Sequence, residues 1–544
     1  MFKQPSVMPT QQHFSQVPRA DIPRSRFDRS HGYKTTFDAG KLIPVFVDEV
    51  LPGDTFTMSS TAFARLATPL KPFMDNVQLD THFFFVPARL VWDNWQEFMG
   101  ERRNPDDNPN DFSVPQYVVE PDHQKQVDSL PAYFGLPILE ASATGPYNTP
   151  LSVTALPFRC YNLIWNEWYR DQNLQRRVPE FRDAGPDPET VNDVPTYQVL
   201  PRGKRKDYFT GALPWPQKGD PVLVPMATDA PLVGLQMTRG QLISGGTIND
   251  LVSMDTGRLA AGLPDGPTRL LPPDGPDAPY VDLSEATAVS INDLRTAFQI
   301  QRLLERDARG GTRYIELILS HFGVQSDDAR LQRPEYLGGG TAHVNINPVA
   351  ATMGSTGLGT APQGNLAAFG TVVGKGGFQK SFTEHGFVIG IVSARADLTY
   401  QNGVERFWSR KTRYDYYWPA LAHLGEQAIL NQEIKYIPQN AESENEGVWG
   451  YQERYAEYRY KPTRITGLFS SAATSSLDVW HLAQDFSSDE DFPVLAAPFI
   501  EENPPIDRVI AVPSEPHFLL DMWFKLYCDR PMPVYSVPGL IDHF

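Results

Sequence analysis

Two stretches of the sequence interleave aromatic and basic side chains, which makes them the best candidates for binding a partner. One runs from residue 406 to 414 (RFWSRKTRY) and the other from 454 to 464 (RYAEYRYKPTR). Cations along a strand attract a phosphate backbone, and aromatic faces stack on nucleobases without sequence preference. Tyr, Trp and Arg are also enriched where protein subunits meet. The pattern therefore indicates a strand surface that contacts single-stranded nucleic acid or a neighbouring subunit, and its composition favours the subunit.

The candidate contact residues are cations and aromatics of these stretches together with three arginines near the N-terminus. In chain order they are Arg24, Arg26, Arg29, Arg406, Trp408, Arg410, Lys411, Arg413, Arg454, Tyr458, Arg459, Lys461 and Arg464. The N-terminal arginines belong to residues 1–36, a polar segment whose six basic and two acidic residues give a net charge of +4. We expect this segment to be a basic arm that is either loose in solvent or meets nucleic acid or a neighbouring subunit.

Motifs for catalysis or metal binding are absent from the sequence. The glycine cluster at 374–377 lacks the spacing of a phosphate-binding loop, and there is neither a G-x-S-x-G nor an H-E-x-x-H motif. The acidic runs at 104–111 and 488–491 lack the pattern of a calcium loop and are typical of solvated turns. We therefore expect no catalytic residues, no metal and no cofactor. A carboxylate pair for glycoside hydrolysis needs only proximity in space, so a lectin or glycan-degrading enzyme remains the alternative.

The composition indicates a mainly β protein with long loops. Among 544 residues there are 49 Pro and 40 Gly, with 31 Phe, 22 Tyr and 10 Trp, a mixture of turn formers and strand-forming aromatics. Cys160 and Cys528 have apolar neighbours, which predicts buried thiols. A net charge of −17 argues against a protein whose whole surface wraps nucleic acid. The most apolar stretch, 386–394, is too short to span a bilayer, so we expect no membrane insertion.

Hydrophobic periodicity predicts the elements that must position these residues. Apolar alternation predicts strands at 77–86, 382–400 and 518–528, with further strands through 451–469. Helical spacing predicts helices at 159–173, 290–310 and 312–322. Because the middle of the chain is helices and loops, the early and late strands must pair with each other, as a jelly roll requires.

Two stretches lack clear periodicity. Residues 338–377 are rich in glycine, which predicts a long loop that passes close to other backbone. Residues 183–285 are rich in proline, with 15 of the 49 prolines between 183 and 282. A structureless loop of that length is unusual inside a compact domain, so this stretch is interpreted as a surface insertion or a small subdomain.

Four segments resemble the major capsid proteins of gokushoviruses, a branch of the microviruses. They are SRFDRSHGYK with the TTFDAGKLIPVFVDEVLPGDTF that follows it, residues 70–101, residues 419–433 (PALAHLGEQAILNQE), and RYAEYRYKPTRITGLF followed by LDVWHLAQDF at 477–486. The segments occur in the family's order. Together they cover the chain from about residue 25 onward, apart from the proline-rich stretch and parts of the glycine-rich one.

The resemblance implies a structural protein and not an enzyme. Its fold would be an eight-stranded viral jelly roll, one domain over residues 37–544, with large loop and helical insertions between strands. About sixty copies would form a closed T=1 icosahedral shell around a circular single-stranded DNA genome, assembled in the cytoplasm of a bacterial host. The insertion at 183–285 would form a protrusion at each threefold axis and contribute to host attachment.

The resemblance also implies partners besides further copies of the chain and the genome. These would be an internal scaffolding protein, a DNA pilot protein, a small basic DNA-packaging protein and a receptor on the bacterial surface. A coat of net charge −17 cannot neutralise a genome alone. The basic packaging protein, together with local Arg and Lys patches, would supply the positive charge.

Overall fold

A computed structural model describes residues 23–101, 111–140, 149–192, 194–220, 332–352, 363–488 and 490–535. Between 221 and 331 it describes residue 222, a set of short strands, one long helix and residues 320–321. The chain forms two compact units, one made of Met1–Pro214 with Asp327–Phe544 and the other of Trp215–Ser326.

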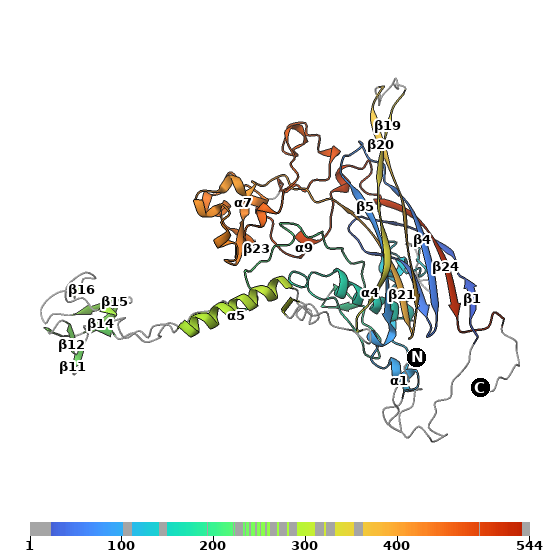
Figure 1. The fold of residues 1–544 in the computed structure, drawn as a ribbon, viewed down its shortest axis with the longest axis horizontal. Coiled ribbons are helices and arrows are strands. Elements are labelled where there is room, and N and C mark those ends of the chain that lie inside the picture. The colour runs from blue at the N-terminus through green and yellow to red at the C-terminus, as the bar shows by residue number, and fades with distance from the viewer. Residues whose placement is uncertain are drawn as a thin grey trace, which may run out of the picture. The chain divides into compact units, whose positions relative to one another are not determined.

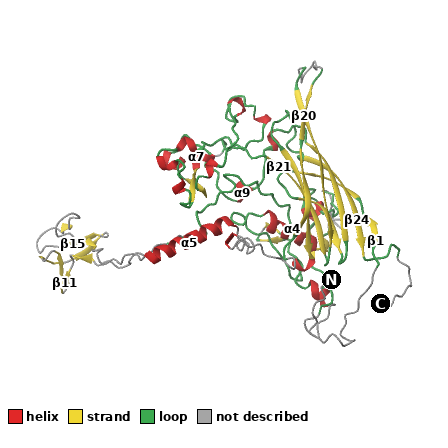
Figure 2. Ribbon diagram, viewed as in Figure 1, coloured by secondary structure: helices red, strands yellow, loops and turns green. Residues whose placement is uncertain are grey.

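Two antiparallel sheets form the body of the larger unit. In the first, the strands are ordered β2 (His31–Phe37), β24 (Phe518–Arg530), β4 (Thr55–Leu66), β20 (Leu366–Ser381) and β19 (Asn345–Ala350), and β1 (Ser25–Asp28) also pairs with β24. In the second, the order is β18 (Glu335–His343), β5 (Val77–Pro87), β21 (Gly386–Ala396) and β3 (Ile43–Val50). The long strands run alongside one another in Figures 1 and 2. The mainly β prediction is confirmed.

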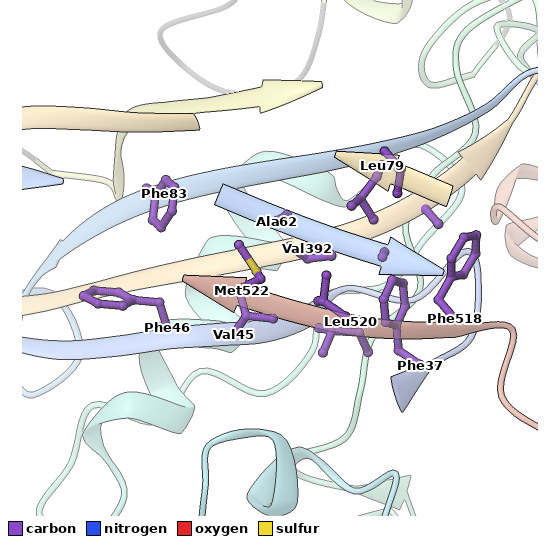
Figure 3. Packing of buried hydrophobic residues seen from close by; sticks show 14 of the residues in the cluster. Phe37, Val45, Phe46, Ala62, Leu79, Phe83, Val392, Phe518, Leu520 and Met522 are labelled. Carbon is purple, nitrogen blue, oxygen red and sulfur yellow. The ribbon is translucent and has the colours of Figure 1, made fainter. Parts of the chain in front are cut away.

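The core lies between these two sheets. Strand β24 alternates strictly, with Phe518, Leu520, Met522 and Phe524 buried and Trp523 exposed on the opposite face. Figure 3 shows side chains of both sheets gathered between them, among them Phe37 and Leu520 of the first and Leu79 and Val392 of the second. Each large apolar side chain buried in this way contributes roughly 1.5–3 kcal/mol. The predicted strands at 77–86 and 518–528 are confirmed, and both cysteines are buried free thiols.

Part of the expected N-terminal arm belongs to the first sheet. Strands β1 and β2 pair with β24, placing Phe27 opposite Cys528 and Tyr33 opposite Met522. Of the two readings of the arm, the loose one is therefore wrong for residues 25–28 and 31–36, because they pair with β24. Contact with nucleic acid or a neighbouring subunit stays a prediction. Residues 1–22 lie outside the described part of the chain.

The glycine-rich stretch forms strands β18, β19 and β20, so the prediction of a long loop was wrong for its described residues. The expected close backbone approach is confirmed. A Cβ atom on Gly339 would lie 2.0 Å from the carbonyl oxygen of Thr81, and one on Gly340 would lie 2.1 Å from that of Lys375. Glycine is therefore needed at both positions for close packing between strands. Residues 353–362 lie outside the described chain.

Two long connections interrupt the sheets. The connection from β5 to β18 carries α4 (Leu156–Ile164), which continues as a π-helical turn, η5 (Trp165–Tyr169). This helix begins three residues before the predicted 159 and ends at 169, because Arg170 has extended backbone. The connection from β21 to β24 spans residues 397–517. It holds short helices and the hairpin of β22 (Glu426–Leu430) with β23 (Val448–Glu453).

The predicted proline-rich insertion divides between the two units. Residues 183–214 belong to the larger unit, where Tyr197 and Tyr208 are buried. The smaller unit has three small antiparallel sheets among its described residues. One pairs β10 (Leu232–Val233) with β17 (Tyr280–Val281). The other two have three strands each, in the orders β11 (Gln236–Thr238), β12 (Gln241–Ser244), β13 (Thr247–Asp250) and β14 (Val252–Asp255), β15 (Arg258–Ala261), β16 (Arg269–Leu270). The smaller unit also holds α5 (Ile291–Gly310), which confirms the predicted helix at 290–310. The helix predicted at 312–322 falls almost wholly on residues outside the described chain.

A buried carboxylate ties the first connection to the second sheet. Asp80 of β5 is 1% exposed and accepts hydrogen bonds from Arg202 and Arg395, each at 2.6 Å, and from Thr341 at 2.5 Å. Burial acts to raise the pKa of Asp80, but Thr341 and the two arginines outweigh it and lower the pKa below the ordinary 3.8. The charged carboxylate is therefore the form that stabilises the fold.

Replacing Asp80 tests this network. Asp80→Asn should lower the free energy of unfolding by about 3 kcal/mol at pH 7, because two partly buried guanidinium groups lose their counter-charge. In the wild type the contribution should be complete above about pH 4 and be lost as the pH falls through the lowered pKa of Asp80. Urea unfolding followed by tryptophan fluorescence between pH 3 and 7 would measure both effects. An equally steep loss of stability at acid pH in the variant would contradict the assignment.

Adjacent residues on opposite faces of β24 provide a matched test of the core. Phe524→Ala should cost about 3–5 kcal/mol of unfolding free energy, because it opens a cavity between the sheets. Trp523→Ala should change stability by less than about 0.5 kcal/mol, because that side chain is exposed. Equal effects of the two substitutions in urea unfolding would contradict the burial pattern.

Candidate functional site

The connection from β21 to β24 brings the two aromatic and basic stretches together. The first forms the short 3-10 helices η6 (Arg406–Ser409) and η7 (Arg413–Asp415), and the second forms η9 (Ala456–Tyr458). Figure 2 shows the chain around α7 (Asn431–Ile434) as short helices joined by loops. The prediction that these residues lie on strands was wrong. Tyr455 has a left-handed φ of 62°, which ends β23, and the Asp415 side chain caps the turn at Thr412.

A small cluster of buried apolar residues packs against these loops. It includes Ile429 and Trp449 of the β22–β23 hairpin, Phe499 from further along the connection, and Tyr208 and Phe209 from the other long connection. Because the turns have few strand hydrogen bonds of their own, this cluster and local side-chain hydrogen bonds hold them in place.

A cavity of about 780 Å³ opens between the two stretches. Seven of the predicted contact residues line it, namely Arg406, Trp408, Arg410, Tyr458, Arg459, Lys461 and Arg464. Its lining also includes Tyr208, Tyr400 and Glu433, which sequence reasoning did not single out. The predicted residues Lys411, Arg413 and Arg454 lie in the same stretches but do not line the cavity.

A buried ion pair lines the cavity beside Tyr208. Arg406 donates to Glu433 at 2.7 Å and to the carbonyl oxygen of Ala428 at 2.6 Å. The Tyr208 hydroxyl donates to the other Glu433 oxygen at 2.8 Å. Burial raises the pKa of Glu433, while Arg406, the Leu430 amide and Tyr208 act in the opposite direction. These groups satisfy one another, so the arrangement is a structural anchor and not a reactive centre.

The cations of the rim are paired with carboxylates of the same chain. Arg410 lies 3.4 Å from Glu457, Arg459 lies 2.6 Å from Glu453, and Lys411 lies 2.8 Å from Glu442. Lys461 and Arg464 both contact Glu405, at 2.7 and 2.5 Å. The hydrogen bond from Arg464 is the largest of the causes that lower the pKa of Glu405. Glu442 comes from a separate segment, whereas Glu405 and Glu453 each directly precede one of the two stretches and Glu457 lies within the second.

Aromatic side chains cover the rim and stack on its cations. The Arg410 guanidinium lies between the rings of Tyr416 and Tyr458, 5.1 and 4.5 Å from their centroids. The exposed aromatic residues of this region are Phe407, Trp408, Tyr414, Tyr416, Tyr417, Trp418 and Tyr458, with Trp408 the most open at 71%. We refer to these seven residues as the aromatic surface. Tyr416, Tyr417 and Trp418 were missed, although they directly continue the first stretch.

The three N-terminal arginines lie apart from the cavity lining. Arg26 is on β1, 3.6 Å from Asp529 and stacked over Tyr527, and Arg29 pairs with Asp48. Arg24 is exposed just before β1. The structure therefore divides the predicted contact residues between the sheet edge and the cavity.

Within the described part of the chain, no group of three or more His, Cys, Asp or Glu side chains is placed to hold a metal ion. Over those residues, too, no helix is long and apolar enough to cross a membrane.

Two ion pairs of different burial test the anchoring role of Arg406. Arg406→Ala should lower the free energy of unfolding by about 3–5 kcal/mol, because it leaves the buried Glu433 without its partner. Lys461→Ala, which removes one partner of the more exposed Glu405, should cost about 0–1 kcal/mol. Thermal and urea unfolding of the two variants would measure the difference, and similar losses would contradict the anchor.

Comparison with known proteins gives a consistent result along the whole chain. A model of the family described as capsid protein (F protein) matches residues 15–540. The capsid protein VP1 of Chlamydia phage 1 is 46% identical over 615 aligned residues, covering 99% of each chain. VP1 of Bdellovibrio phage phiMH2K is 45% identical over 98% of each chain, and VP1 of Spiroplasma virus 4 is 35% identical over 97%.

Proposed function

The chain belongs to the capsid protein (F protein) family of phages, and from this premise we propose that about sixty copies of it form a T=1 icosahedral shell. The coat role itself follows from the family, whose relatives from gokushoviruses match the chain from end to end. The single observation that carries the proposal is this full-length match. The lectin or glycan-degrading alternative has no observation in its favour.

We propose that the two sheets are the halves of an eight-stranded jelly roll. Taken in chain order, β2, β3, β4, β5, β18, β20, β21 and β24 would be strands one to eight. In a jelly roll, one sheet has the order one, eight, three, six and the other has the order two, seven, four, five. The observed orders β2-β24-β4-β20 and β3-β21-β5-β18 agree with this arrangement and support the proposal.

The shell would enclose a circular single-stranded DNA genome. With a net charge of −17 per copy, the coat would need a small basic packaging protein to neutralise the phosphates. An internal scaffolding protein and a DNA pilot protein would complete the assembly, which would take place in the bacterial cytoplasm. The mature chain would be a component of the virion.

The smaller unit, Trp215–Ser326, would form the surface protrusion at each threefold axis and contact a receptor on the host. These residues form a compact unit of their own, which supports this role, since an insertion with its own strands can vary without disturbing the shell. The proposed protrusion is therefore placed at 215–326 in preference to the predicted 183–285, because residues 183–214 pack within the larger unit.

Sedimentation with negative-stain imaging tests the shell. The full chain co-expressed with its scaffolding protein should sediment as uniform small icosahedral particles. A chain that stays monomeric or dimeric in the presence of the scaffold would contradict the proposed function.

Removing the smaller unit tests the protrusion. Replacement of residues 215–326 by a short Gly-Ser linker should yield shells without knobs, and phage carrying it should lose attachment to host cells. The larger unit lies wholly outside the deleted residues. Thermal unfolding of the variant therefore reports whether that unit remains folded. Knobs that persist on folded, assembled variant particles would contradict the placement.

A further inference from the structure

We propose that the aromatic surface docks on a second copy of this chain and not on the genome. The inference rests on the proposed function as a shell subunit and names the partner of the candidate site. Three features carry it: the internal pairing of most of the cations, the local charge, and the fixed positions of two exposed rings.

Most of the cations beside the aromatic surface are already engaged by carboxylates, while Arg413 and Arg454 stack on Tyr414 and Tyr455. Lys411 contacts both Glu442 and Glu446, at 2.8 and 2.6 Å, and Glu405 receives both Lys461 and Arg464. The affinity of a protein for single-stranded DNA comes largely from cations that replace the counterions of the phosphates. A phosphate arriving here would first have to separate these pairs, and the freed carboxylates would then repel it. The surface is therefore poorly suited to the DNA backbone.

The local charge differs from that of the rest of the chain. Residues 400–418 and 454–466 hold eight basic and three acidic residues, a net of +5. The further acidic partners Glu433, Glu442, Glu446 and Glu453 reduce this to +1. The whole chain carries −17, so its copies repel one another in general. The repulsion between two copies is smallest where the acidic charge of each is already neutralised. With a local charge of +1, this surface is such a place.

The exposed rings of Trp418 and Tyr458 are held in place by hydrogen bonds before any partner binds. Trp418 donates its ring N–H to the carbonyl oxygen of Arg413 at 2.8 Å, and the amide of Tyr417 donates to the hydroxyl of Tyr458 at 3.2 Å. The Asp415 carboxylate accepts from the Thr412 amide at 2.6 Å. Side chains that are fixed in advance lose little entropy on binding, and Tyr, Trp and Arg are the residues that contribute most at protein interfaces. The adjoining cavity of about 780 Å³ could receive side chains of the second copy.

Substitutions that leave the fold intact test the partner. In the full chain co-expressed with its scaffolding protein, Trp408→Ala and Tyr416→Ala should each reduce the yield of closed shells at least tenfold, because the lost contact is repeated in every copy. Tyr436→Ala is the matched control, since Tyr436 is 47% exposed and lies outside the aromatic surface, and Tyr416 is 54% exposed. It should assemble like the wild type. Thermal unfolding of the unassembled chains should be nearly the same for all four proteins.

A second measurement distinguishes the genome from a neighbouring copy. Binding of a fluorescent oligothymidylate to the unassembled chains should be unchanged by Trp408→Ala and Tyr416→Ala at 50 and 200 mM salt. Variants that assemble normally, or that assemble and lose DNA binding, would overturn the inference while leaving the proposed function intact. A wild-type chain that forms no shells would instead overturn the proposed function.

Discussion

The pairing of β24 with strands from the other end of the chain is the interaction on which the rest of the structure depends. Its inward residues, from Phe518 to Cys528, lie against β4 on one side and β1 and β2 on the other. These partners are separated by more than 450 residues, so the pairing closes a very long loop. Once it forms, the strands at both ends of the long connections 88–334 and 397–517 are held in the sheets. The entropy of loop closure grows slowly with length, so such connections can be large and carry function without unfolding the sheets.

The sequence predicted those elements whose side chains carry a period. Strand β24 alternates apolar and exposed residues over its whole length, and α5 has the spacing of a helix, so both were found close to their true bounds. The glycine-rich strands were missed because glycine has no side chain to reveal a period. Glycine is needed there because the backbone of a neighbouring strand lies too close for a side chain, as the carbonyl oxygen of Thr81 does beside Gly339. The strands of the smaller unit were missed because they are only two to four residues long.

For the candidate site, the sequence identified the cations and several of the rings but not their surroundings. The carboxylates Glu433 and Glu442 approach from outside the two stretches, and only folding brings them to Arg406 and Lys411. This pairing changes the meaning of the pattern. A run of unpaired cations among aromatics is typical of a nucleic-acid groove, whereas a neutralised one is typical of a protein interface. The two stretches also proved to be short 3-10 helices and turns, so no sheet positions their rings.

The central claim is that this chain builds a closed shell in which the aromatic surface lies between copies. An icosahedrally averaged electron cryo-microscopy reconstruction of the particle would test it most directly. The account predicts about sixty copies per shell, each with Trp408 and Tyr416 covered by protein density of a neighbouring copy. Particles in which these side chains face the interior beside nucleic-acid density, or remain open to solvent, would contradict it.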